Sequence, residues 1–110
     1  MNNIFEDIPD VLREELFTQL FQKEGVKIER IVSQGHSTSE GQWYNQKQDE
    51  WVILLQGQAI LGYENNQQKT LSTGDMVFIP AHTKHRVDWT APDIQTVWLA
   101  VHLNNKRRMW

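Results

Sequence analysis

The side chains of this sequence that could do chemistry are a few histidines and carboxylates. The chain has no cysteine, which excludes disulfides, thiolate nucleophiles and cysteine-rich zinc sites and leaves imidazole and carboxylate groups as the plausible metal ligands. His82 and His85 stand three residues apart in a predicted turn that leads into a strand, so whether both point inward depends on that turn. A glutamate with two or three histidines can bind a divalent metal, and a histidine oriented by a carboxylate can move a proton next to a carbonyl group.

Other catalytic motifs are absent, and the totals exclude several classes of partner. No serine stands in a G-x-S-x-G turn, and no glycine-rich loop precedes a helix in a way that would hold phosphate. The net charge of −3 provides no positive field for nucleic acid. No apolar run could span a bilayer and no signal peptide is visible, so we expect a cytoplasmic protein without a membrane partner.

The length of 110 residues predicts a single domain over residues 1–110, divided into three parts. Residues 1–25 are predicted to be a helical lead-in, residues 26–103 a β-barrel and residues 104–110 a basic tail. The tail contains Lys106, Arg107 and Arg108, which we interpret as a solvated end, with an anionic ligand as the alternative.

The lead-in is predicted to contain a short α-helix over residues 9–25. Leu12, Leu16 and Leu20 recur at every fourth position, which would give one apolar helical face. Pro9 suits the start of such a helix and Gly25 its end. We expect the helix to cover a sheet or part of the core, and a partner-binding helix is the alternative.

The rest of the chain predicts many short strands. Candidate strands are residues 26–33, 42–45, 51–55, 58–64, 69–71, 76–79, 86–89 and 96–103. Residues 51–55 are continuously apolar and suit a strand buried on both faces, Asn65-Asn66 suits a hairpin turn, and Pro80 ends a strand. Regularly spaced strands with one initial helix predict an all-β closed barrel or double-sheet jelly roll.

Two sets of landmarks resemble the motifs of the cupin superfamily, specifically its small single-domain members. Gly74, Pro80 and His85 match the spacing of the second motif, G-(x)5-P-x-G-(x)2-H-(x)3-N, although His82 stands at the second glycine and Trp89 at the asparagine. Glu50 and Gly57 match the second half of the first motif, G-(x)5-H-x-H-(x)3–4-E-(x)6-G. The resemblance covers residues 41–103 and implies a cupin-type barrel.

In that family the H-x-H pair, the glutamate and the later histidine converge on a divalent metal. Here the H-x-H positions hold Trp43 and Asn45 or, with the shorter spacing, Tyr44 and Gln46. The resemblance therefore implies an altered or degenerate metal site. Glu50 and His85 could be joined by His82, His102 or His36 around Mn, Fe, Ni or Zn.

Plainer interpretations stand beside the chemical ones. Glu50 could be satisfied by a backbone donor or by His85 alone, because a buried charge needs only a partner. His82 could be a turn residue, His36 a loop residue and His102 a half-buried strand residue. Most of the tryptophans, Trp51, Trp89, Trp98 and Trp110 among them, are expected to pack, whereas Trp43 or Tyr44 would line a pocket with Gln46.

Three functions follow from these residues and the resemblance. The first is a cupin barrel that binds a small molecule in its pocket, with Glu50 and His85 as the polar groups. The second is a divalent-metal enzyme of the dioxygenase or isomerase type, in which Glu50 and His85 are catalytic and His82 or His102 completes the metal site. The third is a structural or oligomerising module. The resemblance also implies a homodimer.

Overall fold

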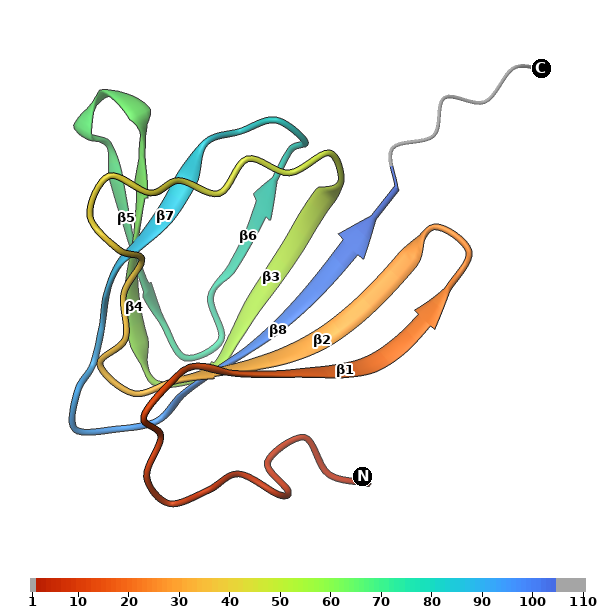
Figure 1. The fold of residues 1–110 in the computed structure, drawn as a ribbon, viewed down its shortest axis with the longest axis vertical. Coiled ribbons are helices and arrows are strands. Elements are labelled where there is room, and N and C mark those ends of the chain that lie inside the picture. The colour runs from red at the N-terminus through yellow and green to blue at the C-terminus, as the bar shows by residue number, and fades with distance from the viewer. Residues whose placement is uncertain (1, 105–110) are drawn as a thin grey trace.

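The computed structural model describes residues 2–104, which form two antiparallel β-sheets that face each other (Figure 1). The five-stranded sheet has the order β1 (Leu16–Lys23), β2 (Val26–Ser33), β8 (Thr96–Leu103), β3 (Asp49–Gln56) and β6 (Met76–Ile79). The three-stranded sheet has the order β5 (Gln68–Ser72), β4 (Gln58–Tyr63) and β7 (His85–Thr90), and the 3-10 turn η1 (Glu64–Asn66) joins β4 to β5. The predicted all-β, double-sheet architecture is confirmed.

The predicted N-terminal helix over residues 9–25 is wrong. Residues 16–23 form β1, an edge strand that pairs antiparallel with β2 through a turn at Gly25, which has a φ of +76°. A β-bulge interrupts the pairing between Gln19 and Phe21. The residues before β1 run as an irregular segment past the open end of this hairpin (Figure 1). Backbone pairing with β2 therefore replaces the hydrogen bonds that a helix would have made.

The buried side chain of Arg30 fixes the N-terminal segment to the outer face of the five-stranded sheet. Its guanidinium donates hydrogen bonds to the backbone carbonyls of Ile4, at 3.1 Å, and Glu6, at 2.6 Å. It also donates to the hydroxyl of Thr18 on β1, at 3.3 Å. Arg30 is only 1% exposed, so these acceptors satisfy a charge that is removed from water.

The strand over residues 51–55 is confirmed as part of β3, but burial on both faces is not. Val52 and Leu54 are buried between the sheets, whereas Trp51 and Ile53 on the outer face are partly exposed. After β3 the chain crosses to the other sheet at Gly57, which has a φ of +99°. The bend at Gly57 therefore joins the two layers.

The other predicted turns and strands are largely confirmed. Asn65 and Asn66 adopt positive φ values of 68° and 61° between β4 and β5, and β6 ends immediately before Pro80. The predicted strand over residues 42–45 is reduced to one bridge between Tyr44 and His85. That bridge holds the long β2–β3 loop against β7 (Figure 1).

The core lies between the two sheets and is built from the inward-facing residues of both, including Leu54, Ala59, Leu71, Ile79 and Trp98. Within residues 2–104 there is no helix long and apolar enough to cross a membrane. The predicted basic cluster, Lys106 to Arg108, and Trp110 lie outside the described residues.

Candidate functional site

A pocket of about 110 Å³ opens between the two sheets. Most of its residues are inner-face residues of the strands, and loop residues from between β2 and β3 complete one wall. Its lining consists of Glu15, Phe17, Glu29, Ile31, Tyr44, Gln46, Glu50, Val52, Leu61, Ile79, His85, Val87, Trp98 and His102. Aliphatic and aromatic groups thus surround a small set of polar atoms, as is usual in small-molecule sites.

Glu50 and His85 meet inside this pocket from opposite sheets. Glu50 is on β3 and 7% exposed, and His85 begins β7 and is 5% exposed. The Oε1 atom of Glu50 lies 3.8 Å from the Nε2 atom of His85, which is longer than a hydrogen bond. Among the described residues the same Oε1 atom has no hydrogen-bond partner, and neither has Oε1 of Gln46.

The imidazole of His85 is held in one orientation. Its Nδ1 atom lies 2.8 Å from the backbone carbonyl oxygen of Thr83, which can only accept, so Nδ1 carries the hydrogen and Nε2 faces Glu50. The ring of Tyr44 stacks on that of His85 with a centroid distance of 5.6 Å. The backbones of the two residues exchange hydrogen bonds of 2.8 and 3.1 Å, which fixes Tyr44 over the histidine.

His102 lies in the same pocket, but it is hydrogen-bonded to a different carboxylate. It stands opposite Glu50 on the neighbouring strand β8. Its Nε2 atom donates a 2.9 Å hydrogen bond to Oε1 of Glu29 on β2. Nothing in the sequence marks Glu29 as a pocket residue, because only the pairing of β2 with β8 brings it beside His102.

A second missed carboxylate, Glu15, closes another side of the pocket. The indole Nε1 of Trp98 donates to the hydroxyl of Ser33 at 3.2 Å, and that hydroxyl donates to Oε2 of Glu15 at 2.6 Å. Glu15 lies just before β1, in the segment predicted to be helical. Because this segment was predicted to be a helix, the position of Glu15 at the pocket could not be expected from the sequence.

The two central carboxylates have opposite electrostatic environments. Burial raises the pKa of Glu50 above its ordinary value, and the nearby His102 and His85 only partly oppose this. The hydrogen bond from His102 lowers the pKa of Glu29, against the effect of its partial burial. Glu29 therefore ionises more readily than an ordinary glutamate, and Glu50 less readily.

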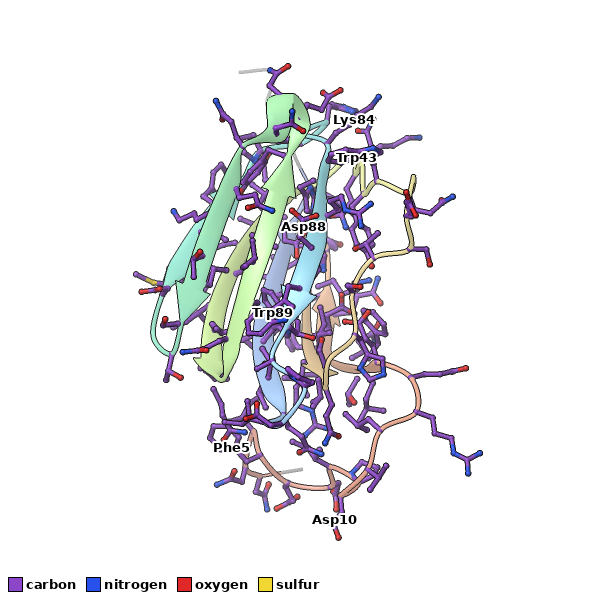
Figure 2. The ribbon with its side chains drawn as sticks, turned by 90° about the vertical axis from the view of Figure 1, so that its left-hand side faces the viewer. Phe5, Asp10, Trp43, Lys84, Asp88 and Trp89 are labelled. Atoms are coloured by element: carbon purple, nitrogen blue, oxygen red, sulfur yellow. The ribbon has the colours of Figure 1, made fainter. Side chains whose placement is uncertain are left out.

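Three other predicted residues lie outside this pocket. His82 is exposed in the turn before β7, with a φ of 64°, which explains why the family motif has glycine there. Trp43 is 41% exposed and packs against the guanidinium of Arg86, which is 5.9 Å from the ring centroid. Figure 2 shows Trp43 at the same end of β7 as Lys84, on the outside. The ring of His36 is tied to the backbone of Gln34 and Arg13.

Comparisons with known proteins agree with this fold. The model of the cupin domain family matches residues 30–102, so the chain belongs to the cupin family. A crystal structure of a "putative mannose-6-phosphate isomerase" from Ralstonia eutropha JMP134 has a TM-score of 0.90 and 41% sequence identity, covering 94% of this chain and 97% of that one.

More distant solved structures support the fold alone. A cupin superfamily protein from Desulfitobacterium hafniense DCB-2 has a TM-score of 0.73 and 23% identity, covering 89% of this chain and 84% of that one. An RmlC-like cupin from Desulfovibrio desulfuricans has a TM-score of 0.75 and 14% identity, covering 94% and 95%. A search of curated proteins found no match.

The pocket does not present the metal donors of the family motif. Of the four family positions, Glu50 and His85 are present, and Tyr44 and Gln46 line the pocket where the H-x-H pair would be. The phenol and amide are poorer donors than imidazole, and His102 is already bonded to Glu29. Within residues 2–104 no group of three or more histidine, aspartate or glutamate side chains is arranged to hold a metal ion.

Proposed function

We propose that this cupin binds a small molecule in the pocket between its sheets, in a site whose ancestral metal-binding positions have been altered. The observation that carries the proposal is the Oε1 atom of Glu50, which is buried without a hydrogen-bond partner among the described residues. An unsatisfied buried polar group costs about 1–3 kcal/mol. A ligand that hydrogen-bonds to Glu50 would recover this energy, and the apolar walls would supply the rest of the contact.

The name of the 41% identical structure introduces a phosphorylated sugar as a candidate ligand. The described residues that line this pocket include Glu15, Glu29 and Glu50 but no lysine or arginine. A phosphate group is most often bound by lysine, arginine or backbone N–H groups at a helix N-terminus. We therefore propose a ligand without phosphate for this chain.

A second candidate function is proton transfer by Glu50 and His85. A carboxyl group with a raised pKa beside an imidazole whose Nε2 is available could serve as an acid and base pair. An isomerase that moves a proton next to a carbonyl group would use such a pair. This function also requires ligand binding in the pocket, so binding is the property to test first.

The first experiment is a thermal-shift screen of neutral, cationic and anionic small molecules against the wild type and Glu50→Gln. A ligand at 100 times its Kd should stabilise the native protein by about 2.7 kcal/mol. We expect the shift to be lost in Glu50→Gln and kept in Glu64→Gln, because Glu64 is exposed, forms an ion pair of 3.9 Å with Lys84 and does not line the pocket. Hits that shift wild type and Glu50→Gln equally would place binding elsewhere.

We also propose that the chain forms a homodimer through the outer face of its five-stranded sheet. Phe21, Trp51 and Phe78 lie in one row across that face, and Phe21 and Phe78 are 48% and 53% exposed. Exposed apolar rows of this kind are found where proteins associate. If two copies packed through this face, each copy would cover the row of the other.

A further inference from the structure

Among the described residues, three hydrogen-bond acceptors in the pocket receive no hydrogen bond from the protein. Nδ1 of His85 donates to Thr83, so in the neutral ring Nε2 presents a lone pair. The Oε1 atoms of Glu50 and Gln46 have no partner among the described residues. All three side chains line the same pocket, and Glu50 is more than nine-tenths buried.

The spacing of two of these acceptors suits one donor group placed between them. Nε2 of His85 and Oε1 of Glu50 are 3.8 Å apart, too far to bond to each other. One ligand nitrogen could lie about 2.9 Å from both atoms, because that is the usual N–H···O distance. Such a nitrogen must carry at least two hydrogens, as an ammonium group does.

The charges around the pocket favour a positive ligand. Three carboxylates, Glu15, Glu29 and Glu50, line the pocket. Glu29 accepts a hydrogen bond from His102, which lowers its pKa and favours its charged form. No lysine or arginine of residues 2–104 lines the pocket. These carboxylates would repel a carboxylate or phosphate ligand and would attract an ammonium group.

The walls and the size limit the rest of the ligand. Leu61, Ile79 and Val87 present aliphatic surface to the pocket. A volume of about 110 Å³ admits a ligand of fewer than about ten non-hydrogen atoms, given that one water-sized position takes roughly 10–15 Å³.

From these observations we infer that the pocket recognises a small alkylammonium ion, whose nitrogen donates to Glu50 and His85 and whose alkyl group contacts the aliphatic wall. The inference rests on the proposed function and specifies the chemical class of its ligand. Oε1 of Gln46 is a further acceptor without a partner among the described residues in the same pocket.

The test is an NMR titration at pH 7, with a chelator present, using three probes of similar size: n-butylammonium, 1-butanol and butyrate. We expect chemical shifts of Glu50, His85 and their neighbours to move with n-butylammonium at least tenfold more tightly than with 1-butanol, and no binding of butyrate. Glu50→Gln should weaken n-butylammonium binding to the level of 1-butanol. Glu64→Gln, which removes an exposed carboxylate, should leave the titration unchanged.

The other outcomes separate this inference from the proposed function. Binding of butyrate as tight as that of n-butylammonium would overturn the inference while showing that the pocket does bind small molecules. Equal binding of 1-butanol and n-butylammonium, or binding that appears only when a divalent metal replaces the chelator, would overturn it in the same way. Failure of all three probes would also overturn it, and failure of the wider thermal-shift screen would then remove the proposed function as well.

Discussion

At the scale of single residues, Glu50 and Glu29 should affect stability in opposite directions as pH changes. The raised pKa of Glu50 means that the folded protein holds this proton more tightly than the unfolded chain, so its contribution to stability falls as pH rises above about 4.3. Glu50→Gln cannot ionise. Its free energy of unfolding, measured with urea, should therefore improve relative to wild type as pH rises above the ordinary glutamate value of about 4.3.

Glu29 provides the matched comparison on the neighbouring part of the sheet. Its lowered pKa contributes stability that is present above the ordinary glutamate pKa and is lost as pH falls through the folded value. Glu29→Gln should therefore be destabilising at neutral pH, and the difference from wild type should shrink below about pH 4. Parallel pH profiles for the two variants would contradict the environments assigned to these carboxylates.

The side chains of Tyr44 and Gln46 should decide whether the site binds a metal ion. We expect wild type, after incubation with excess Mn, Fe, Ni or Zn and removal of the unbound metal, to hold well under one ion per chain by elemental analysis. The double variant Tyr44→His, Gln46→His restores the H-x-H pair at the spacing of the family motif, together with Glu50 and His85. It should bind close to one ion.

The control for that comparison is His85→Ala in both backgrounds, with proteins that carry no affinity tag. Metal in the double variant should disappear when His85 is replaced. Near-stoichiometric metal in the wild type that is lost in His85→Ala would instead show that Glu50 and His85 recruit other donors, and the altered-site proposal would fail.

At the scale of elements, the sequence predicted most strands but assigned the first one to a helix. Leu12, Leu16 and Leu20 are four residues apart, and a spacing of four places side chains on one face of a strand as well as on one face of a helix. Only pairing with β2 decides between the two structures, and that pairing is not a local property. The turn at Gly25 was located correctly but serves a hairpin.

The same reason explains which residues of the pocket could be expected from the sequence and which could not. Glu50 and His85 lie within recognisable turn and strand landmarks, and the structure brings them together. Glu15 and Glu29 reach the pocket only through the β1–β2–β8 arrangement, which no spacing in the sequence reveals. His82 could not be placed without the backbone angle of its turn, which directs it to solvent.

The bend between the two sheets should be intolerant of any side chain. A Cβ atom at Gly57 would lie 2.7 Å from the Cα atom of Thr96, and the φ of +99° is unfavourable for other residues. Gly57→Ala should lower the free energy of unfolding by more than about 2 kcal/mol, since strained backbone alone costs about 1–3 kcal/mol. Urea denaturation measures this.

Gly41 is the control, because it also has a positive φ, of +79°, but no atom of residues 2–104 would lie within 4 Å of a Cβ atom at this position. Gly41→Ala should cost only the conformational penalty of about 1–2 kcal/mol. Equal losses in the two variants would show that contact with Thr96 does not determine the role of Gly57.

At the scale of the whole molecule, the two faces of the five-stranded sheet have different roles. The inner face meets the three-stranded sheet and forms the core and the pocket. On the outer face one row of apolar side chains crosses all five strands, through Phe21, Ile28, Val101, Trp51 and Phe78. Antiparallel partners in register share a face, so this row is continuous. A protein that worked as a monomer would leave it in water.

The homodimer proposal therefore predicts that a charge placed in this row separates the two copies. Wild type should sediment with twice its chain mass of 13.0 kDa at tens of micromolar, because pairing two copies through this face would remove the exposed Phe21 and Phe78 from water. Phe78→Asp should sediment as a monomer with little loss of stability, since Phe78 is 53% exposed. Trp89→Asp, which introduces the same charge at a 40% exposed aromatic residue on the three-stranded sheet, should remain dimeric (Figure 2). A wild type that is monomeric at these concentrations would refute the proposal, and a dimer disrupted by Trp89→Asp but not by Phe78→Asp would place the interface on the smaller sheet.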